Sequence, residues 1–107
     1  MTLDGTEWRV HVLAAEDTGA VEITIRFDAG HAGGRGGVNR YRGTYMLDGD
    51  ELTFGPLMST RMAGPEEAMR LEALWFQALA QAVTARLDGD ELVLRHADGS
   101  TSRLRPA

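Results

Sequence analysis

Glu72 occupies a position at which a carboxylate needs a partner. It lies in the helix predicted over residues 66–82, and at about 100° per residue it points to the apolar side, beside Phe76. An unpaired carboxylate there would be strongly destabilising, so it requires an arginine or several backbone N–H groups. We expect a buried structural ion pair with Arg61, with Arg40 as the second candidate partner. A functional acid and an exposed position at the helix edge are the alternatives.

A second group with chemical potential is a local cluster of arginines. Arg35, Arg40 and Arg42 lie close together in the sequence, and Tyr41 stands between the last two. One interpretation is a solvated loop followed by a strand with arginines on its polar face. The other is a contact with an anion or an acidic partner, which guanidinium groups bind well. We therefore take these four residues as the candidate interaction surface.

Other arrangements that support catalysis or cofactor binding do not occur. His11, His31 and His96 are not at metal-ligand spacing, so no metal site is expected. The chain has no cysteine and no lysine, which excludes thiolate metal sites, cysteine nucleophiles and Schiff-base chemistry. The glycine-rich segment 30–37 precedes a predicted strand, whereas a phosphate-binding loop needs a helix. We predict a protein that is not an enzyme and holds no cofactor.

The composition describes one acidic domain. The 107 residues include 11 basic and 16 acidic side chains, for a net charge of −5, and they suffice for a single core over residues 1–107. This acidity argues against nucleic acid as a partner. No apolar run approaches the roughly 18 residues of a membrane span, and we expect no secretory signal, because the first residues given lack its charged and apolar regions. We expect a cytoplasmic protein; an exported or lipid-anchored parent whose leader has been removed is the alternative.

The elements that must position these residues are mostly strands. Alternating apolar and polar residues are typical of half-buried strands, and an Asp-Gly pair between short apolar runs is typical of a hairpin. These patterns predict strands over residues 7–15, 20–27, 42–47, 52–54, 83–87, 92–95 and 101–104. The glycine-rich segment 30–37 is interpreted as a loop. Pro65, followed by two glutamates, indicates the start of the one helix, which we expect to lie on the sheet.

Two segments carry a family resemblance. Gly-Gly-Val-Asn-Arg-Tyr at 36–41 and the segment Leu-Thr-Phe-Gly-Pro-Leu-Met-Ser-Thr-Arg-Met-Ala-Gly-Pro at 52–65, followed by Glu72 and Leu79, resemble the META domain of the HslJ heat-shock family. The resemblance implies an α+β fold, with an antiparallel sheet curled into a partly open barrel and one main helix packed against it. Family members are small bacterial proteins, often secreted or lipid-anchored, and linked to stress, antibiotic tolerance, motility or virulence. The resemblance implies no catalytic residues.

The sequence departs from the family pattern at two positions. The family usually has cysteines where this chain has Val38 and Gly64, and the resemblance implies that these cysteines form a disulfide. A reducing location would tolerate the loss of both together. We therefore expect Val38 and Gly64 to be neighbours in space.

The functional hypothesis is a noncatalytic binding module in stress response or in an envelope-associated function. Its partner would be an unidentified protein that contacts the arginine-bearing surface, or an extended peptide added to a free sheet edge. The alternative is a small-ligand carrier that uses the interior of the half-open barrel, with Trp8, Phe27 and Trp75 as its lining. A large internal cavity would favour the carrier, and a filled core would favour the module.

Overall fold

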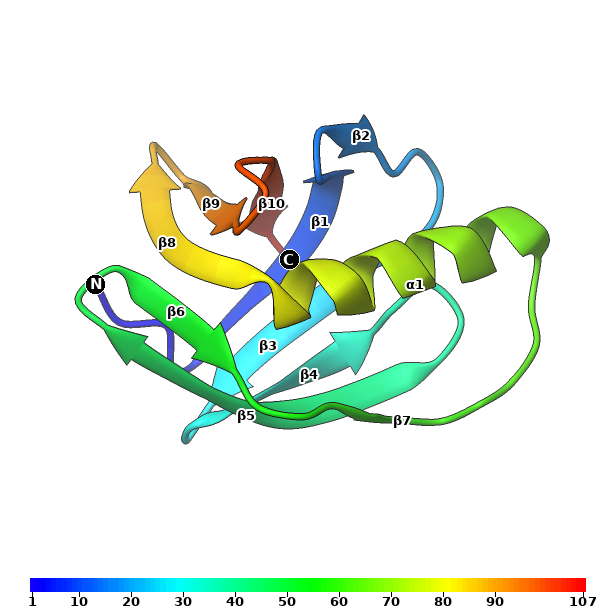
Figure 1. Ribbon diagram of the computed structural model, residues 1–107, viewed down its shortest axis with the longest axis horizontal. Helices are drawn as coiled ribbons and strands as arrows, with labels where there is room; N and C mark the ends of the chain where they lie inside the picture. The colour runs from blue at the N-terminus through cyan, green and yellow to red at the C-terminus, as the bar shows by residue number, and fades with distance from the viewer.

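The computed structural model describes all residues, 1–107, and shows a closed antiparallel barrel of eight strands (Figure 1). The barrel strands are β1 (Thr6–Leu13), β3 (Thr24–Asp28), β4 (His31–Arg35), β5 (Arg40–Asp48), β6 (Glu51–Phe54), β8 (Ala82–Asp88), β9 (Glu91–His96) and β10 (Thr101–Pro106). They are adjacent in the order β1, β3, β4, β5, β6, β8, β9, β10, and β10 pairs with β1 to complete the circle. Two short strands lie outside it. β2 (Glu16–Asp17) pairs with β1, and β7 (Met58–Ser59) pairs with β5.

This architecture confirms the expected antiparallel sheet with one helix, and it shows how the barrel closes. The narrowest contact between neighbouring strands lies between β6 and β8, where Glu51 is paired with Thr84. There the Ala85 N–H donates to the carbonyl oxygen of Asp50 at 2.8 Å. The other neighbouring strands pair over three or more residues, so the barrel is closed but has one weak junction.

The helix α1 (Glu66–Ala80) lies across one end of the barrel. It contacts β1 and β6, which are on opposite sides of the circle of strands. Its Trp75 is fully buried and its Leu79 is 1% exposed, because the apolar stripe of the helix faces the barrel interior. No helix in the chain has the length and apolar character that crossing a membrane requires.

The side chains that alternate along the strands fill the barrel. Ile25 and Phe27 of β3 are fully buried, whereas Arg26 and Asp28 between and after them are exposed. Eighteen buried hydrophobic residues, from the eight barrel strands, the helix and the segments that contain Leu3 and Ile23, form one cluster. The alternating pattern therefore locates the core correctly.

One expected loop is a strand. The segment 30–37, interpreted from its glycines as a loop, contains β4, which pairs with β3 on one side and β5 on the other. The interpretation was wrong because neighbouring strands on both sides supply the order that glycine-rich residues lack on their own. Gly33 permits a close approach, since a Cβ there would lie 2.6 Å from the carbonyl oxygen of Tyr41.

Candidate functional site

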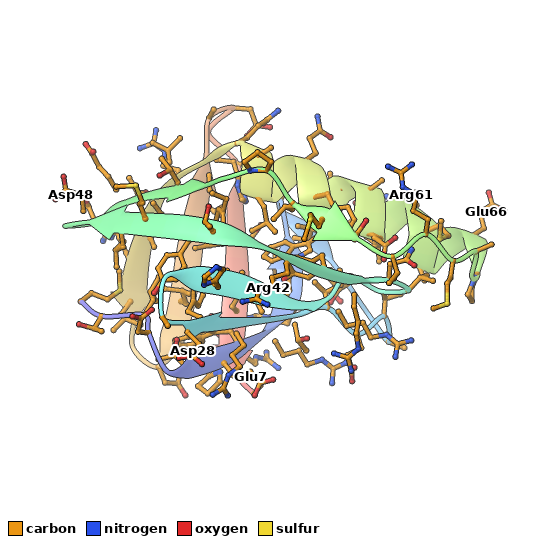
Figure 2. All side chains as sticks on the ribbon, turned by 90° about the horizontal axis from the view of Figure 1, so that it is seen from below. Glu7, Asp28, Arg42, Asp48, Arg61 and Glu66 are labelled. Atoms are coloured by element: carbon orange, nitrogen blue, oxygen red, sulfur yellow. The ribbon has the colours of Figure 1, made fainter.

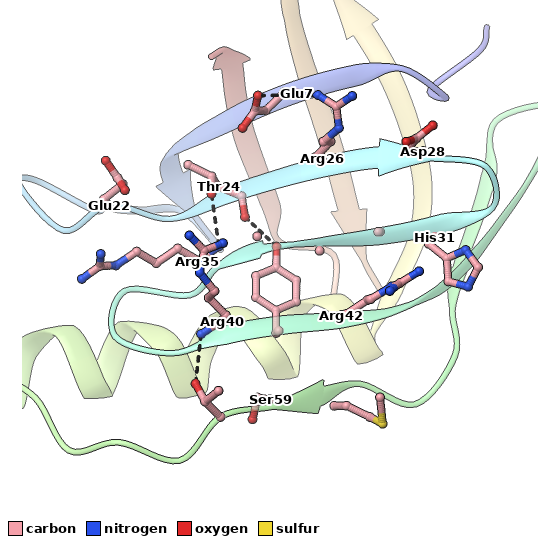
Figure 3. A pocket seen from close by; sticks show the side chains of 16 residues that line it. Glu7, Glu22, Thr24, Arg26, Asp28, His31, Arg35, Arg40, Arg42 and Ser59 are labelled. Atoms are coloured by element: carbon pink, nitrogen blue, oxygen red, sulfur yellow. Dashed lines mark hydrogen bonds and ion pairs between the residues drawn. The ribbon is translucent and has the colours of Figure 1, made fainter.

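A groove of about 940 Å³ lies on the outer face of β3, β4, β5 and β7 (Figure 3). We call it the arginine groove. Only three of its 16 lining residues are hydrophobic, so it is a polar surface. Its lining comprises Glu7, Glu22, Thr24, Arg26, Asp28, His31, Ala32, Gly33, Gly34, Arg35, Arg40, Tyr41, Arg42, Met58, Ser59 and Thr60.

Strand register builds the arginine groove. One row of paired residues crosses it in the order Glu7, Arg26, Gly33, Arg42, Met58, from β1 to β7. Directly paired residues on neighbouring strands point to the same face of a sheet. The side chains of Arg26 and Arg42 rise above the sheet, whereas the residue between them, Gly33, has no side chain. The surface is therefore lower between the two arginines than at them. The hollow is therefore a product of glycine at one register position.

The arginines on one side of the groove have no acidic partner within the chain. Arg35, Arg40 and Arg42 are exposed, and none of them takes part in an ion pair. Arg26, across the groove, forms a long ion pair with Glu7, in which Nη1 of Arg26 is 4.0 Å from Oε1 of Glu7. The structure thus brings together the three arginines that the sequence singled out and adds a fourth.

The opposite side of the groove is acidic. It is lined by Asp28 of β3, Glu22 of the segment before β3, and Glu7 of β1. Figure 2, viewed from below, shows Glu7, Asp28 and Arg42 on the same side of the molecule. The surface therefore carries two charge signs, with the unpaired positive charges concentrated on β4 and β5.

Tyr41 lies beneath this surface and is buried, whereas we expected it to be exposed on the interaction surface. Its side chain is 4% exposed, its hydroxyl donates to the carbonyl oxygen of Thr24 at 2.7 Å, and its ring meets Phe76 of the helix edge to face at 5.4 Å. Burial raises the pKa of this phenol well above its ordinary value. The prediction was wrong because Tyr41 belongs to the inward-facing residues of β5, between the outward-facing Arg40 and Arg42.

Glu72 is buried, but it does not pair with an arginine. Its Oε1 accepts hydrogen bonds from the backbone N–H groups of Val38 at 3.1 Å and Asn39 at 2.5 Å. Its Oε2 accepts one from Nδ2 of Asn39 at 2.8 Å. Arg61 is exposed, makes no ion pair and points outward near the helix start (Figure 2), and Arg40 also lacks an acidic partner. The expected ion pair is wrong, whereas the alternative of backbone N–H groups is what the structure contains.

Asn39 extends this arrangement to the segment before the helix. Its Oδ1 accepts from the backbone N–H of Met62 at 2.7 Å and from the hydroxyl of Thr60 at 2.9 Å, and its Nδ2 also donates to the carbonyl oxygen of Met62 at 3.1 Å. We call Glu72, Asn39 and the groups they bind the carboxylate latch. Sequence reasoning missed Asn39, although its place in the Gly-Gly-Val-Asn motif at 36–39 could have indicated a role.

Val38 and Gly64 lie against each other beside the latch. A Cβ on Gly64 would be 3.4 Å from Cβ of Val38 and 2.7 Å from its Cγ2. The first distance is close to the roughly 3.5–4.5 Å that separates the Cβ atoms of a disulfide. Val38 therefore fills the space that a second side chain would need.

The residues proposed to line an internal site belong to the core. Trp8 is 7% exposed, and Phe27 and Trp75 are fully buried. Neither the arginine groove nor a second, smaller hollow is lined by any of them. That second hollow, of about 490 Å³, lies outside the barrel, between the β6–β7 connection and α1.

A buried histidine lies away from both sites. His96 is 2% exposed, and its Nε2 is 2.7 Å from the hydroxyl oxygen of the fully buried Ser102. The same oxygen accepts a hydrogen bond from the backbone N–H of Ala14 at 2.9 Å. Burial lowers the pKa of His96 below its ordinary value. The pair supports the β1–β2 turn, and its burial keeps it from any substrate.

The fold and its sites define a small antiparallel barrel with one helix, a filled interior and a charged groove on its outer face. The family model described as the META domain matches residues 1–107, and the chain belongs to this family. The resemblance seen in the sequence is thereby confirmed at the level of the META domain. No curated protein matches the chain.

Three solved structures are similar to this chain. A protein from Burkholderia xenovorans, determined by NMR, has 25% sequence identity and a TM-score of 0.79, and the match covers 98% of this chain and 83% of that one. A second protein determined by NMR has 21% identity and a TM-score of 0.76, with 97% and 91% covered. A crystal structure of a DUF4847 family protein from Bacteroides vulgatus has 21% identity and a TM-score of 0.55, with 76% and 55% covered. The last two support the fold alone.

Proposed function

We propose that this META domain is a noncatalytic binding module and that the arginine groove binds an anionic partner. The observation that carries the proposal is that Arg35, Arg40 and Arg42 gather on one concave face without any ion pair, in a chain whose net charge is −5. In such a chain, with its excess of carboxylates, arginines can readily be neutralised internally. Those left free can form bidentate, charge-assisted hydrogen bonds with the carboxylate or phosphate of a partner.

The filled interior supports a module over a carrier. Trp8, Phe27 and Trp75 occupy the space that a carried ligand would need, and small-ligand sites are clefts or cavities with largely apolar walls. The arginine groove is instead a polar surface. A partner would therefore be met from outside the barrel.

The biological setting of the proposal comes from the family resemblance. We place the module in stress response or in an envelope-associated function, as the resemblance implies. The valine and glycine at positions 38 and 64 suit a reducing compartment, which supports a cytoplasmic location. An exported or lipid-anchored parent is the alternative.

The proposal can be tested by retention of the purified domain on immobilised poly-glutamate. The double variant Arg40→Gln with Arg42→Gln removes two groove charges. The matched control, Arg86→Gln with Arg95→Gln, removes two exposed arginines of β8 and β9 that also lack ion pairs.

We expect the control and the wild type to elute at the same salt concentration and the groove variant to elute earlier. Equal elution of both variants would contradict the proposal. So would a small molecule that co-purifies with all three proteins and is detected by mass spectrometry, because it would favour a carrier.

A further inference from the structure

We propose that the occupant of the arginine groove is an extended acidic peptide segment whose carboxylates lie on alternate residues. This inference rests on the proposed function and specifies the partner. It follows from the spacing of the free arginines, from the glycine floor of the groove and from the acidic side that faces the arginines.

The spacing of the arginines matches an extended chain. Arg40 and Arg42 are two residues apart on β5 and point to the same face, so their Cα atoms are separated by roughly 7 Å. Residues i and i+2 of an extended peptide have the same separation and also share a face. Arg35, which pairs with Arg40 across β4 and β5, adds a third guanidinium near one end. A peptide laid along these strands can place successive carboxylates opposite successive arginines.

The floor of the groove leaves room for a peptide backbone. Gly33 on β4 lies between Arg26 and Arg42 and raises no side chain above the sheet. The five residues of β4 extend over roughly 15 Å, which is the length of four or five extended residues. Met58, 74% exposed at the β7 wall, offers an adaptable apolar contact to a side chain beside the acids.

The acidic side of the groove selects against a polyanion. Glu7, Glu22 and Asp28 line the same hollow, and a nucleic acid or a polyphosphate would bring a continuous row of negative charges against them. A peptide carries its charge only on chosen side chains, and its backbone N–H groups can donate to carboxylates that it passes. The mixed charge of the groove therefore favours an acidic peptide over the other anions that arginines bind.

The test is a chemical-shift titration of the ¹⁵N-labelled domain at low ionic strength with two capped peptides of identical composition. One, Thr-Glu-Thr-Glu-Thr, places its carboxylates on one face, and the other, Thr-Thr-Glu-Glu-Thr, places them on opposite faces. Inorganic tripolyphosphate and a short single-stranded DNA are titrated in parallel. The variants are Arg40→Gln with Arg42→Gln and the control Arg86→Gln with Arg95→Gln.

We expect the alternating peptide to bind about tenfold more tightly than its isomer, because only it engages two arginines at once. The groove variant should lose about tenfold in affinity for the alternating peptide, and the control variant should keep wild-type affinity. Shifts should be confined to β3, β4, β5 and β7.

Two results would overturn the inference in distinguishable ways. Tighter binding of tripolyphosphate or DNA than of the alternating peptide, or equal binding of the two peptides, with loss in the groove variant, would overturn the peptide assignment and leave the anion-binding groove intact. If no probe depends on Arg40 and Arg42, both this inference and the proposed function fail.

Discussion

The carboxylate latch and the arginine groove are adjacent in the chain, since Asn39 of the latch precedes Arg40 of the groove. They differ in whether the chain itself satisfies the charges that they hold. In the latch, a buried charge receives every hydrogen bond it needs from its own chain: two backbone N–H groups and the amide of Asn39 bind Glu72. In the groove, the exposed Arg35, Arg40 and Arg42 receive no ion-pair partner from their own chain. The difference teaches that a charge satisfied by its own chain is structural, whereas exposed charges that lack ion pairs and gather in one hollow form a surface open to a partner.

The largest effect should come from breaking the latch with Glu72→Ala. The substitution leaves the N–H groups of Val38 and Asn39 and the amide of Asn39 without their acceptor in a buried place. We expect a loss of about 3–5 kcal/mol in the free energy of unfolding, measured by urea denaturation. A loss below about 1 kcal/mol would show that the latch is not structural and would remove the contrast with the groove.

A smaller effect is expected where the chain packs beside the latch. Gly64→Ala places a methyl group against Val38 and should cost about 1–3 kcal/mol of stability. In a Val38→Ala background the same change should cost much less, because the space is then free. A double-mutant cycle in thermal denaturation measures this coupling. Equal costs in the two backgrounds would mean that the two positions do not touch in solution.

The pH dependence of stability distinguishes the buried His96 from the exposed His31. Because His96 is buried and its pKa lies below its ordinary value near 6.5, the unfolded chain binds a proton at a pH where the folded chain does not. The contribution of His96 to the free energy of unfolding should therefore be fully present above about pH 6.5. It should decrease as the pH falls below that value. His96→Gln should flatten this dependence between pH 5 and 7, whereas substitution of the exposed His31 by glutamine should preserve it. A steep dependence retained without His96 would assign it to another group.

The smallest effect on stability should come from the groove. Arg40→Gln with Arg42→Gln removes no interaction that the folded chain makes through these guanidinium groups, so the free energy of unfolding should change by less than about 0.5 kcal/mol. Urea denaturation beside the matched variant Arg86→Gln with Arg95→Gln measures the difference. A larger loss would indicate that the groove arginines are structural.

Much of the fold can be predicted from residue patterns, because local periodicity reports which face of an element is buried. Alternation at Ile25 and Phe27 predicts a strand, and the stripe through Trp75 predicts the orientation of the helix. Strand β4 could not be predicted in this way, since its glycines carry no periodic signal and its order comes from β3 and β5. Barrel closure likewise depends on pairing between β1 and β10, the two ends of the chain.

The candidate site could be predicted only in part. The cluster of Arg35, Arg40 and Arg42 is visible in the sequence because the residues are neighbours along the chain. Their hollow depends on Gly33 being aligned with Arg42, which is a matter of register between strands. The partners of Glu72 were misassigned because charge alone favours an arginine, whereas loop geometry supplies backbone N–H groups 33 and 34 residues away.

The most direct test of the account is the chemical-shift titration of the wild-type domain with the alternating peptide Thr-Glu-Thr-Glu-Thr. We expect saturable shifts for residues of β4 and β5 around Gly33, with the latch residues Asn39 and Glu72 unshifted. Saturable shifts confined to the core around Trp75, or no shifts in the groove at any peptide concentration, would contradict it.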